Sequence, residues 1–448
     1  MIYTIKDKLL SMAQKKTTYK KISQKKEHTR YRRAVVAFIA IVCFFAFAWN
    51  GYKNSDFYSF PTGGTATDIT DTDKNQHKPQ TSAKVTDNTG VLNNRQIDLL
   101  ENYASLYAQT LQSMKPQDVS HLYYDSDSRH CVVNNTALKI LTDIRGMRDL
   151  DLTLEYATVE YIVKDVAVSG SKATVNLIEN NTQKFRHLSQ PSYNANINHI
   201  FVLIQSNDSW LIKEHQHEED FYLLTGEGWE DAKGETNHLR GQQAYDLIIA
   251  DARENLSDME QFQQGKILDL KVADTSYNRD AAVSYAQQWW NTRNYTGNYL
   301  AYDNFGGNCQ NFASQCIHAG GIDMDYTGVH DVQWKFYDED LNNKATARGR
   351  SYSWTGVDMF YSYAVNNYAD GLVTLTDIDY SYAEKGDIIH VGAYYQWRHA
   401  LLVTDVLKSG DGTLQDIVVA SNTADRWNYP LSAYIYTGAR LIHILGQN

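Results

Sequence analysis

A run of sixteen apolar residues near the N-terminus, 34–49, constrains this chain more than any other feature. It contains no charged side chain, and the 33 residues before it carry eleven Lys or Arg against two acids. An apolar run with a basic flank is typical of a segment that inserts into a membrane and leaves its basic end in the cytoplasm. We therefore expect a basic cytoplasmic segment at 1–33 and a single-pass transmembrane signal anchor at 34–52, with the rest of the chain outside the cell.

A cleaved signal peptide is the alternative interpretation of the same run. Residues 46–48 read Ala-Phe-Ala, which resembles a small-residue cleavage site, and cleavage would leave a secreted protein. The basic head is long for a signal peptide, which favours the uncleaved anchor.

The charge of the remaining residues excludes one class of partner. Residues 34–448 hold 31 basic and 51 acidic side chains, a net charge of about −20. An acidic exterior repels phosphates, so we expect no nucleic acid as partner. Four cysteines in 448 residues also exclude a scaffold built on disulfides.

Composition and periodicity divide the rest of the chain into four parts. Residues 53–94 are rich in Thr, Asp, Asn and Gly and poor in large aliphatics, which predicts a disordered linker. An amphipathic helix followed by alternating segments predicts an α+β domain at 95–225. Residues 226–271 are expected to form a helical connector, and 272–448 a C-terminal α+β domain.

The domain at 95–225 resembles the NTF2-like or cystatin-like shape in its order of elements, a helix followed by a curved antiparallel sheet. Four alternating segments are predicted strands, and turns at 168–171 and 206–209 join them in pairs: 152–165, 167–179, 196–205 and 209–218. His215 and His217 are expected on a solvated polar face of the last strand, because their spacing does not indicate a metal site.

The segment 306–321 is predicted to carry the chemistry of the C-terminal domain. A glycine pair frees the backbone for a turn, Asn308 can cap a helix, and apolar periodicity starts after Cys309. Cys309 then lies in the first turn, where unpaired N–H groups and the helix dipole stabilise a thiolate. A buried, unreactive cysteine is the alternative. His318 falls on the opposite side of this helix and cannot serve Cys309 as a base.

A reactive cysteine needs an imidazole to take its proton and a third group to orient that imidazole. His399 opens the apolar strand 399–406 and is the preferred base, with three other histidines of the domain as competitors: His330, His390 and His443. Asn422, at the end of the predicted strand 416–421, can orient the ring through its amide oxygen.

Several stretches of 272–448 resemble the putative amidase domain family, which is related to the papain-like cysteine hydrolases of the NlpC/P60 and CHAP groups. They are Tyr-Asn-Arg-Asp-Ala-Ala at 277–282, Asn-Cys-Gln-Asn-Phe at 308–312, Lys-Gly-Asp-Ile-Ile at 385–389, His-Ala-Leu-Leu-Val at 399–403 and Asn-Thr-Ala-Asp-Arg at 422–426. The resemblance implies a papain-like fold with Cys309 as nucleophile, His399 as base and Asn422 as orienting residue.

The chain departs from the family pattern at two positions. The family usually has aspartate where this chain has Asn308, and histidine where it has Asn422. For the oxyanion we expect the backbone N–H of Cys309 and a side chain, either Gln310 or Tyr302. Trp354 is a candidate for the wall of a substrate cleft, with core packing as the alternative.

The sequence thus predicts a membrane-anchored, extracytoplasmic cysteine amidase or peptidase that acts on peptidoglycan peptides. It requires no cofactor and shows no ligand spacing for a metal. A non-catalytic module that binds wall fragments or a protein, with a degenerate site, is the alternative, and an acyltransferase is a third possibility. The hydrolase hypothesis requires the sulfur of Cys309 and a ring nitrogen of His399 within about 4 Å, in an open groove.

Overall fold

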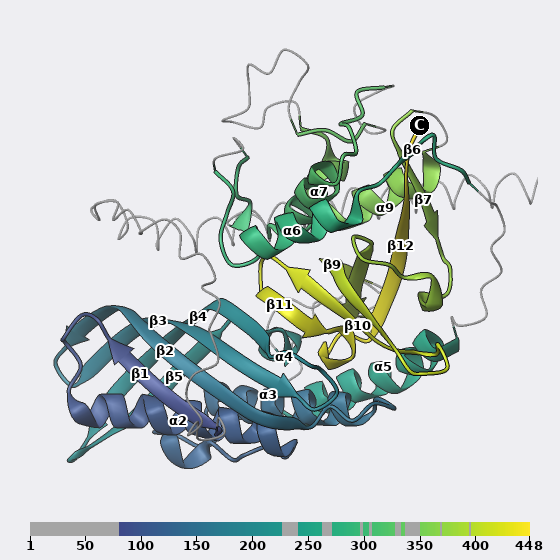
Figure 1. Cartoon of the computed structure of the whole chain (residues 1–448). Helices are drawn as coiled ribbons and strands as arrows, with labels where there is room; N and C mark the ends of the chain where they lie inside the picture. Colours follow the sequence, from purple (N-terminus) through teal and green to yellow (C-terminus); the bar gives the residue numbers. More distant parts are fainter. Residues whose placement is uncertain are drawn as a thin grey trace, which may run out of the picture. The chain divides into compact units, whose positions relative to one another are not determined.

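The architecture is given by a computed structural model (Figure 1), which describes residues 80–225, 241–261, 271–295, 299–303, 307–327, 333–336, 350–367, 370–393 and 396–448. All of them belong to one compact unit, His77–Asn448. The predicted basic segment, the predicted anchor and the linker up to residue 79 lie outside the described residues. Among the helices that the structure does describe, none combines the length and apolar character needed to cross a membrane.

Two long helices, α2 (Asn94–Ser113) and α3 (Arg129–Gly146), pack on the first part of the sheet. A capping box fixes the start of α2. The side chain of Asn93 accepts a hydrogen bond from the backbone N–H of Gln96 at 3.1 Å, and the side chain of Gln96 accepts one from the backbone N–H of Asn93 at 2.9 Å. The predicted apolar stripe of α2 is buried, including Leu99, Leu100, Tyr103, Tyr107 and Leu111. A 3-10 turn, η1 (Ser120–Leu122), connects the two helices.

Four antiparallel strands follow where alternation predicted them. They are β2 (Leu154–Ser169), β3 (Lys172–Phe185), β4 (Ser192–Ser206) and β5 (Ser209–His217). The first turn lies at the predicted place, and Gly170 takes the left-handed conformation there with φ +60°.

An additional strand, β1 (Ser82–Asp87), lies inside the stretch 53–94 that was expected to be an unstructured linker. It pairs in parallel with β2, from Ser82 opposite Thr158 to Asp87 opposite Val163, and Val85 is buried. The expectation therefore does not hold for these six residues. Two apolar positions in so short a segment give little periodicity, and the pairing with β2 supplies the hydrogen bonds that order it.

The C-terminal part packs helices on one face of a second group of strands (Figure 1). The helices are α6 (Arg279–Trp289), α7 (Cys309–Ala319), α8 (Tyr352–Thr355) and α9 (Val357–Asn366). The strands are β6 (Thr275–Ser276), β7 (Leu372–Thr376), β8 (Ile388–Ala393), β9 (Gln396–Lys408), β10 (Leu414–Ser421), β11 (Asp425–Pro430) and β12 (Gly438–Gln447), with the 3-10 turns η6 (Tyr380–Tyr382) and η7 (Leu431–Ala433).

The two groups of strands form one continuous sheet. Its order is β1-β2-β3-β4-β11-β10-β9-β8-β12-β6, with β5 beside β4 and β7 beside β12. The junction is antiparallel, with Asp425 opposite Ala195 and Trp427 opposite Tyr193. Two helices link the groups in sequence: α4 (Asp220–Thr225) and, within the predicted helical connector, α5 (Gln242–Gln261). The described residues therefore have a mixed α/β architecture on a twelve-stranded sheet.

Close packing of α6 against α7 depends on the glycine pair that ends α7. A Cβ on Gly320 would lie 2.2 Å from the ring of Tyr277, so only glycine fits at this position. Gly321 has φ +90°, a left-handed conformation that is common where a helix ends at glycine. The contact fixes the end of α7 against the residues that precede α6, where the backbone N–H of Asn278 also donates to the oxygen of Gly320 at 2.8 Å.

Candidate active site

The helix α7 begins at Cys309, as the sequence predicts, but Asn308 does not cap it with its side chain. The amide oxygen of Asn308 instead accepts from the backbone N–H of Tyr302 at 3.0 Å and from the side chain of Asn311 at 2.9 Å. Its amide nitrogen donates to the side-chain oxygen of Asn422 at 2.6 Å. Asn308 thus connects the turn before Cys309 through hydrogen bonds to Tyr302 and to Asn422.

The thiol of Cys309 lies against strand β9. Residue 309 is 6% exposed, and burial raises the pKa of its thiol above the ordinary value. Hydrogen bonds from the backbone N–H groups of Ala400, Gln310 and Cys309 lower the pKa of the thiol, but their effect is smaller than that of burial. The expectation of a thiolate stabilised by the helix start is therefore wrong for this structure, in which the thiol is protonated at neutral pH.

The thiol of Cys309 lies at Ala400, where the pairing between β9 and β10 has ended. Pairing between β9 and β10 stops at Leu402 opposite Ala420, and the same register would place Ala400 opposite residue 422, one position beyond the end of β10. The backbone N–H of Ala400 faces the sulfur of Cys309 instead. The nucleophile candidate therefore contacts the peptide unit that directly follows His399.

His399 leaves β9 on the other face of the sheet. It pairs with Val391, whose side chain belongs to the same core as Leu401, whereas Ala400 packs with Cys309. A bulge at Arg398 precedes it, and bulges of this kind redirect neighbouring side chains. Imidazole and thiol thus lie on opposite faces of the sheet, and no hydrogen bond joins these two described side chains. Both residues are buried, so the close approach in an open groove that the hydrolase hypothesis requires is not present in this structure.

Burial also decides the charge of His399. It lowers the pKa of the imidazole to about 4, with Asp220 acting to raise that pKa and Arg426 to lower it. The ring is therefore neutral at pH 7 and can accept a proton. Together with the protonated thiol, this makes the resting state a neutral pair rather than an ion pair.

The competing histidines of the C-terminal part are engaged in hydrogen bonds where the structure describes them. His390 bonds Gln310 at 2.9 Å through Nε2 and Arg440 at 3.1 Å through Nδ1. His443 bonds Asp387 at 2.7 Å. His330 lies outside the described residues. His399 makes no hydrogen bond to a described residue at either ring nitrogen, so its ring can accept a proton. His318 lies on the far side of α7 and is not a candidate.

Asn422 is held in place by the end of α6. Its amide nitrogen donates to three backbone oxygens, those of Trp289, Trp290 and Thr292, at 3.1, 2.9 and 3.1 Å. Its oxygen accepts from Asn308, and the residue is fully buried. The structure thus brings Asn422 to Asn308, the residue before Cys309, and shows no hydrogen bond from Asn422 to His399.

The remaining predicted site residues are buried. Gln310 joins His390 and Ser314, and Trp354 packs against Trp334 with ring centroids 4.7 Å apart. Neither has exposed surface, so neither lines an open cleft here. The ring of Tyr302 lies under the guanidinium of Arg350, with 5.0 Å between them.

The structure also corrects the expected solvated face at His215 and His217, because both side chains are buried. His215 accepts or donates at 3.0 Å with His199, which lies 3.1 Å from Glu179, and the rings of His199 and His217 stack at 4.9 Å. Alternation shows that these residues share a face, but the sequence does not show that α3 and α4 cover it. No group of three His, Cys, Asp or Glu side chains in the described residues is arranged to hold a metal.

Comparison with known proteins supports the amidase label for the C-terminal part. Residues 276–445 match the family described as "Putative amidase domain". The uncharacterized protein YhbB of Bacillus subtilis (strain 168) is 32% identical over 138 residues, which are 29% of this chain and 36% of YhbB. The chain therefore spans about a third of the length of that relative.

Among solved structures, a putative scytalone dehydratase from Novosphingobium aromaticivorans overlaps 28% of this chain and 83% of its own, at 9% identity and a TM-score of 0.19. A score this low supports no conclusion about fold. The family match at 276–445 supports a hydrolase in the C-terminal part.

Proposed function

We propose that residues 272–448 form a papain-like cysteine amide hydrolase, with Cys309 as the nucleophile and His399 as the base. The observation that carries the proposal is the position of Cys309: it starts α7 inside the region that matches the amidase family, and its thiol faces the peptide unit after His399. His399 supports it further, because its ring is neutral and has no hydrogen bond to the part of the chain that the structure describes.

The proposed reaction starts from the neutral pair. The ring of His399 must first turn to the face of β9 that carries the thiol, because the two side chains lie on opposite faces of the sheet. The thiol of Cys309 then transfers its proton to His399, and the sulfur attacks the amide carbonyl carbon to form a tetrahedral intermediate. The carbon–nitrogen bond then breaks, and the imidazolium gives its proton to the leaving amine. Water, deprotonated by the neutral ring, cleaves the thioester and releases the acid. The backbone N–H of Cys309 is the proposed oxyanion donor.

Asn422 contributes to this site through Asn308 in the proposal. The two amides fix the turn that presents Cys309, and three backbone oxygens at the end of α6 fix Asn422 in turn. Because Cys309 is 6% exposed, a substrate carbonyl reaches the sulfur only if the side chains over it move. We infer that substrate binding and opening of the site are coupled.

Peptidoglycan stem peptides are the proposed substrate, and the outer side of the cell membrane the proposed location. The apolar run 34–49 behind a basic head supports an anchored protein, and the acidic remainder is compatible with an extracytoplasmic domain. The domain at 95–225 is proposed to be NTF2-like, on the order of its helices and strands.

Amine release from synthetic stem peptides by the full-length protein tests the hydrolase proposal. We expect activity that Cys309→Ala and His399→Ala each reduce at least about 10³-fold, because both remove a reacting group. Cys316→Ala is the matched control: Cys316 is a fully buried thiol on the same helix. A Cys309→Ala variant that retains wild-type activity would refute the proposal.

A non-catalytic binding module is the second candidate, and the burial of the Cys309 thiol with its raised pKa favours it. The rate of iodoacetamide labelling as a function of pH separates the two. A hydrolase whose thiol is activated by substrate should label faster at pH 7 when a substrate analogue is present. Labelling that rises only above about pH 8.5, with or without the analogue, favours the binding module.

A further inference from the structure

The turn between β10 and β11 has an unusual backbone conformation next to the candidate site. Thr423 and Ala424 follow Asn422 with φ values of +67° and +52°, in the left-handed region that favours glycine. A β-branched residue such as threonine rarely occupies this region, because its Cβ substituents crowd the backbone. Strained residues of this kind persist only where surrounding contacts hold them, and they cluster at functional sites. The contacts of Thr423 therefore indicate what this turn does.

The hydroxyl of Thr423 bonds to the segment that leads into α7. It accepts a hydrogen bond from the backbone N–H of Asn308 at 2.6 Å and donates one to the carboxylate of Asp303 at 3.3 Å. The two segments lie close together, since a Cβ on Gly307 would lie 3.6 Å from the methyl carbon of Thr423. The residue directly before Cys309 is therefore bonded through its backbone to the β10–β11 turn.

Thr423 is itself fixed by two carboxylates that share one guanidinium. Its backbone N–H donates to Asp425 at 2.9 Å, and its hydroxyl donates to Asp303. Arg293 lies 2.6 Å from Asp303 and 3.1 Å from Asp425. Asp425 is buried, so its ion pair is only weakly screened by solvent. Asn196, on β4 of the preceding domain, donates to the other oxygen of Asp425 at 2.8 Å. Residues from both groups of strands therefore hold the turn in its left-handed conformation.

The backbone of Asn308 also sets the direction of the proposed oxyanion donor. The N–H of Cys309 belongs to the peptide unit that begins at Asn308, so its direction depends on the two backbone torsions of Asn308. The bond to Thr423 restricts these torsions, because it fixes the N–H on the other side of the same Cα. A displacement of about 1 Å at a reacting group can cost on the order of 100-fold in rate. The hydroxyl of Thr423 therefore acts on the rate without contacting the substrate.

We propose that Thr423 is a positioning residue for Cys309, which its hydroxyl holds through the backbone at the start of α7. The buried ion pair and Asn196 keep the turn of Thr423 in the conformation that presents this hydroxyl, so the domain at 95–225 contributes to the site. The inference rests on the proposed function. It concerns the nucleophile and the oxyanion donor, and it does not depend on which ring accepts the proton.

Two substitutions at position 423 of the full-length protein separate the hydroxyl from the shape of the side chain. Thr423→Val keeps the branched shape but leaves the N–H of Asn308 without its acceptor. In amine release from stem peptides we expect it to lower kcat at least about tenfold, with KM within about twofold, because the substrate contacts remain. Thr423→Ser keeps the hydroxyl and should retain at least about a third of the wild-type kcat. Wild-type kcat in Thr423→Val, or equal losses in the two variants, would overturn the inference.

Hydrogen exchange at the backbone amide of Asn308 measures the same contact without any activity. Thr423→Val should increase the exchange rate of this amide at least about tenfold, whereas Thr423→Ser should not. A merely structural role predicts instead that exchange becomes faster throughout the domain in both variants. An unchanged rate at Asn308 in Thr423→Val counts against the positioning role.

A second variant decides the inference if Thr423→Val does not fold. Asn196 has φ +59°, so Asn196→Gly keeps the backbone conformation and removes only the side chain that bonds Asp425. Asn207→Gly is the matched control, because Asn207 belongs to the same domain and has φ +54° in the turn between β4 and β5. We expect Asn196→Gly to lower kcat at least about fivefold and Asn207→Gly to leave it within about twofold. Equal kcat values in these two variants would contradict the positioning role.

The proposed function and this inference fail in different ways. Activity that survives Cys309→Ala removes the proposed function, and hydrogen exchange at Asn308 then still decides whether the hydroxyl of Thr423 holds the start of α7. Activity that depends on Cys309 but is unaffected by Thr423→Val leaves the hydrolase standing and removes only the positioning role.

Discussion

His399 should make a measurable contribution to the acid sensitivity of folding. The residue is 5% exposed, and burial lowers the pKa of its ring from 6.5 to about 4. A shift of this size is worth roughly 3 kcal/mol. Because the folded-state pKa lies below the unfolded one, the stabilisation is fully present above pH 6.5 and is lost as the pH falls from 6.5 to 4.

Urea unfolding of the wild type and of His399→Gln between pH 7.5 and 4 isolates this contribution. Glutamine does not titrate, so the unfolding free energy of the wild type relative to the variant should fall by about 3 kcal/mol over that range. His121→Gln, which removes an exposed histidine, is the matched control. A difference that stays constant to within about 0.5 kcal/mol would refute the placement of the ring in a buried environment.

Three further substitutions test the packing and the charges around the site. Gly320→Ala should cost about 2 to 3 kcal/mol of unfolding free energy, because its Cβ would lie 2.2 Å from Tyr277; an unchanged urea midpoint contradicts this packing. Arg145→Lys should cost about 2 kcal/mol, because an ammonium cannot replace the guanidinium on Ala433, Gln183 and Tyr429 at once, and calorimetry measures the loss. Burial raises the pKa of Glu219 to about 7. The protonated side chain therefore contributes its full stability to the fold below pH 4.5, and this contribution is lost as the pH rises through 7. The stability of Glu219→Gln relative to the wild type should therefore rise by up to about 3 kcal/mol over that window, and a flat difference in urea unfolding would contradict it.

Local patterns predicted local structure well in this chain. The start of α7 at Cys309 follows from a glycine pair and from apolar periodicity, both of which act within a few residues. The four strands of the domain at 95–225 follow from alternation in the same way. In each case the residues that determine the structure are the residues that adopt it.

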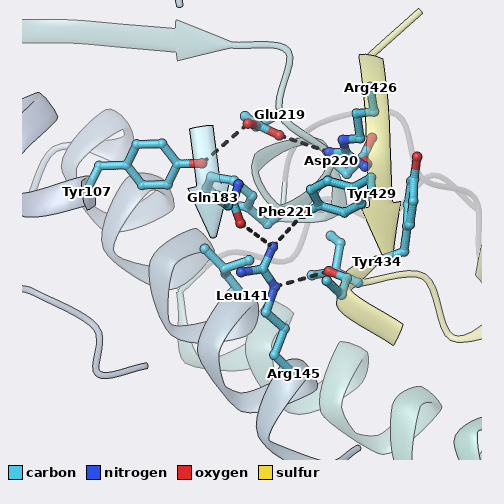
Figure 2. Close-up of a pocket in the computed structure, with 12 residues that line it drawn as sticks. Tyr107, Leu141, Arg145, Gln183, Glu219, Asp220, Phe221, Arg426, Tyr429 and Tyr434 are labelled. Atoms are coloured by element: carbon cyan, nitrogen blue, oxygen red, sulfur yellow. Dashed lines mark hydrogen bonds and ion pairs between the residues drawn. The ribbon is translucent and has the colours of Figure 1, made fainter. Parts of the chain in front are cut away.

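The properties that the sequence did not show depend on contacts between distant segments. The helix start at Cys309 favours a thiolate, but the burial of the thiol against β9 dominates its pKa, and nothing near residue 309 reveals that burial. Alternation placed His215 and His217 on one face of β5 without showing that helices cover it. Arg426 forms buried ion pairs with Glu219 and Asp220 (Figure 2), about 200 positions earlier in the chain, and a single sequence does not reveal such contacts.

The two departures from the family pattern are in contact with each other, which changes their meaning. Where the resemblance has an aspartate and a histidine, this chain has Asn308 and Asn422, and their amides share a hydrogen bond of 2.6 Å. This chain therefore has a neutral pair of amides at the two positions, and their buried polar groups are hydrogen-bonded to each other. Neither change removes a group that reacts in the proposed mechanism, so together they do not indicate a lost activity.

A double-mutant cycle tests this interpretation. Asn308→Asp alone places an unpaired carboxylate beside Asn422, and Asn422→His alone gives up the bonds to the end of α6, so each should destabilise the protein by about 2 to 4 kcal/mol. With both substitutions present, the new carboxylate and the new imidazole can form an ion pair, and the double variant should recover about 1 to 3 kcal/mol relative to the sum of the single changes. Urea unfolding at pH 7 measures all four proteins. If the losses of unfolding free energy in the two single variants simply add up in the double variant, the two asparagines are independent substitutions. That result would favour a degenerate site.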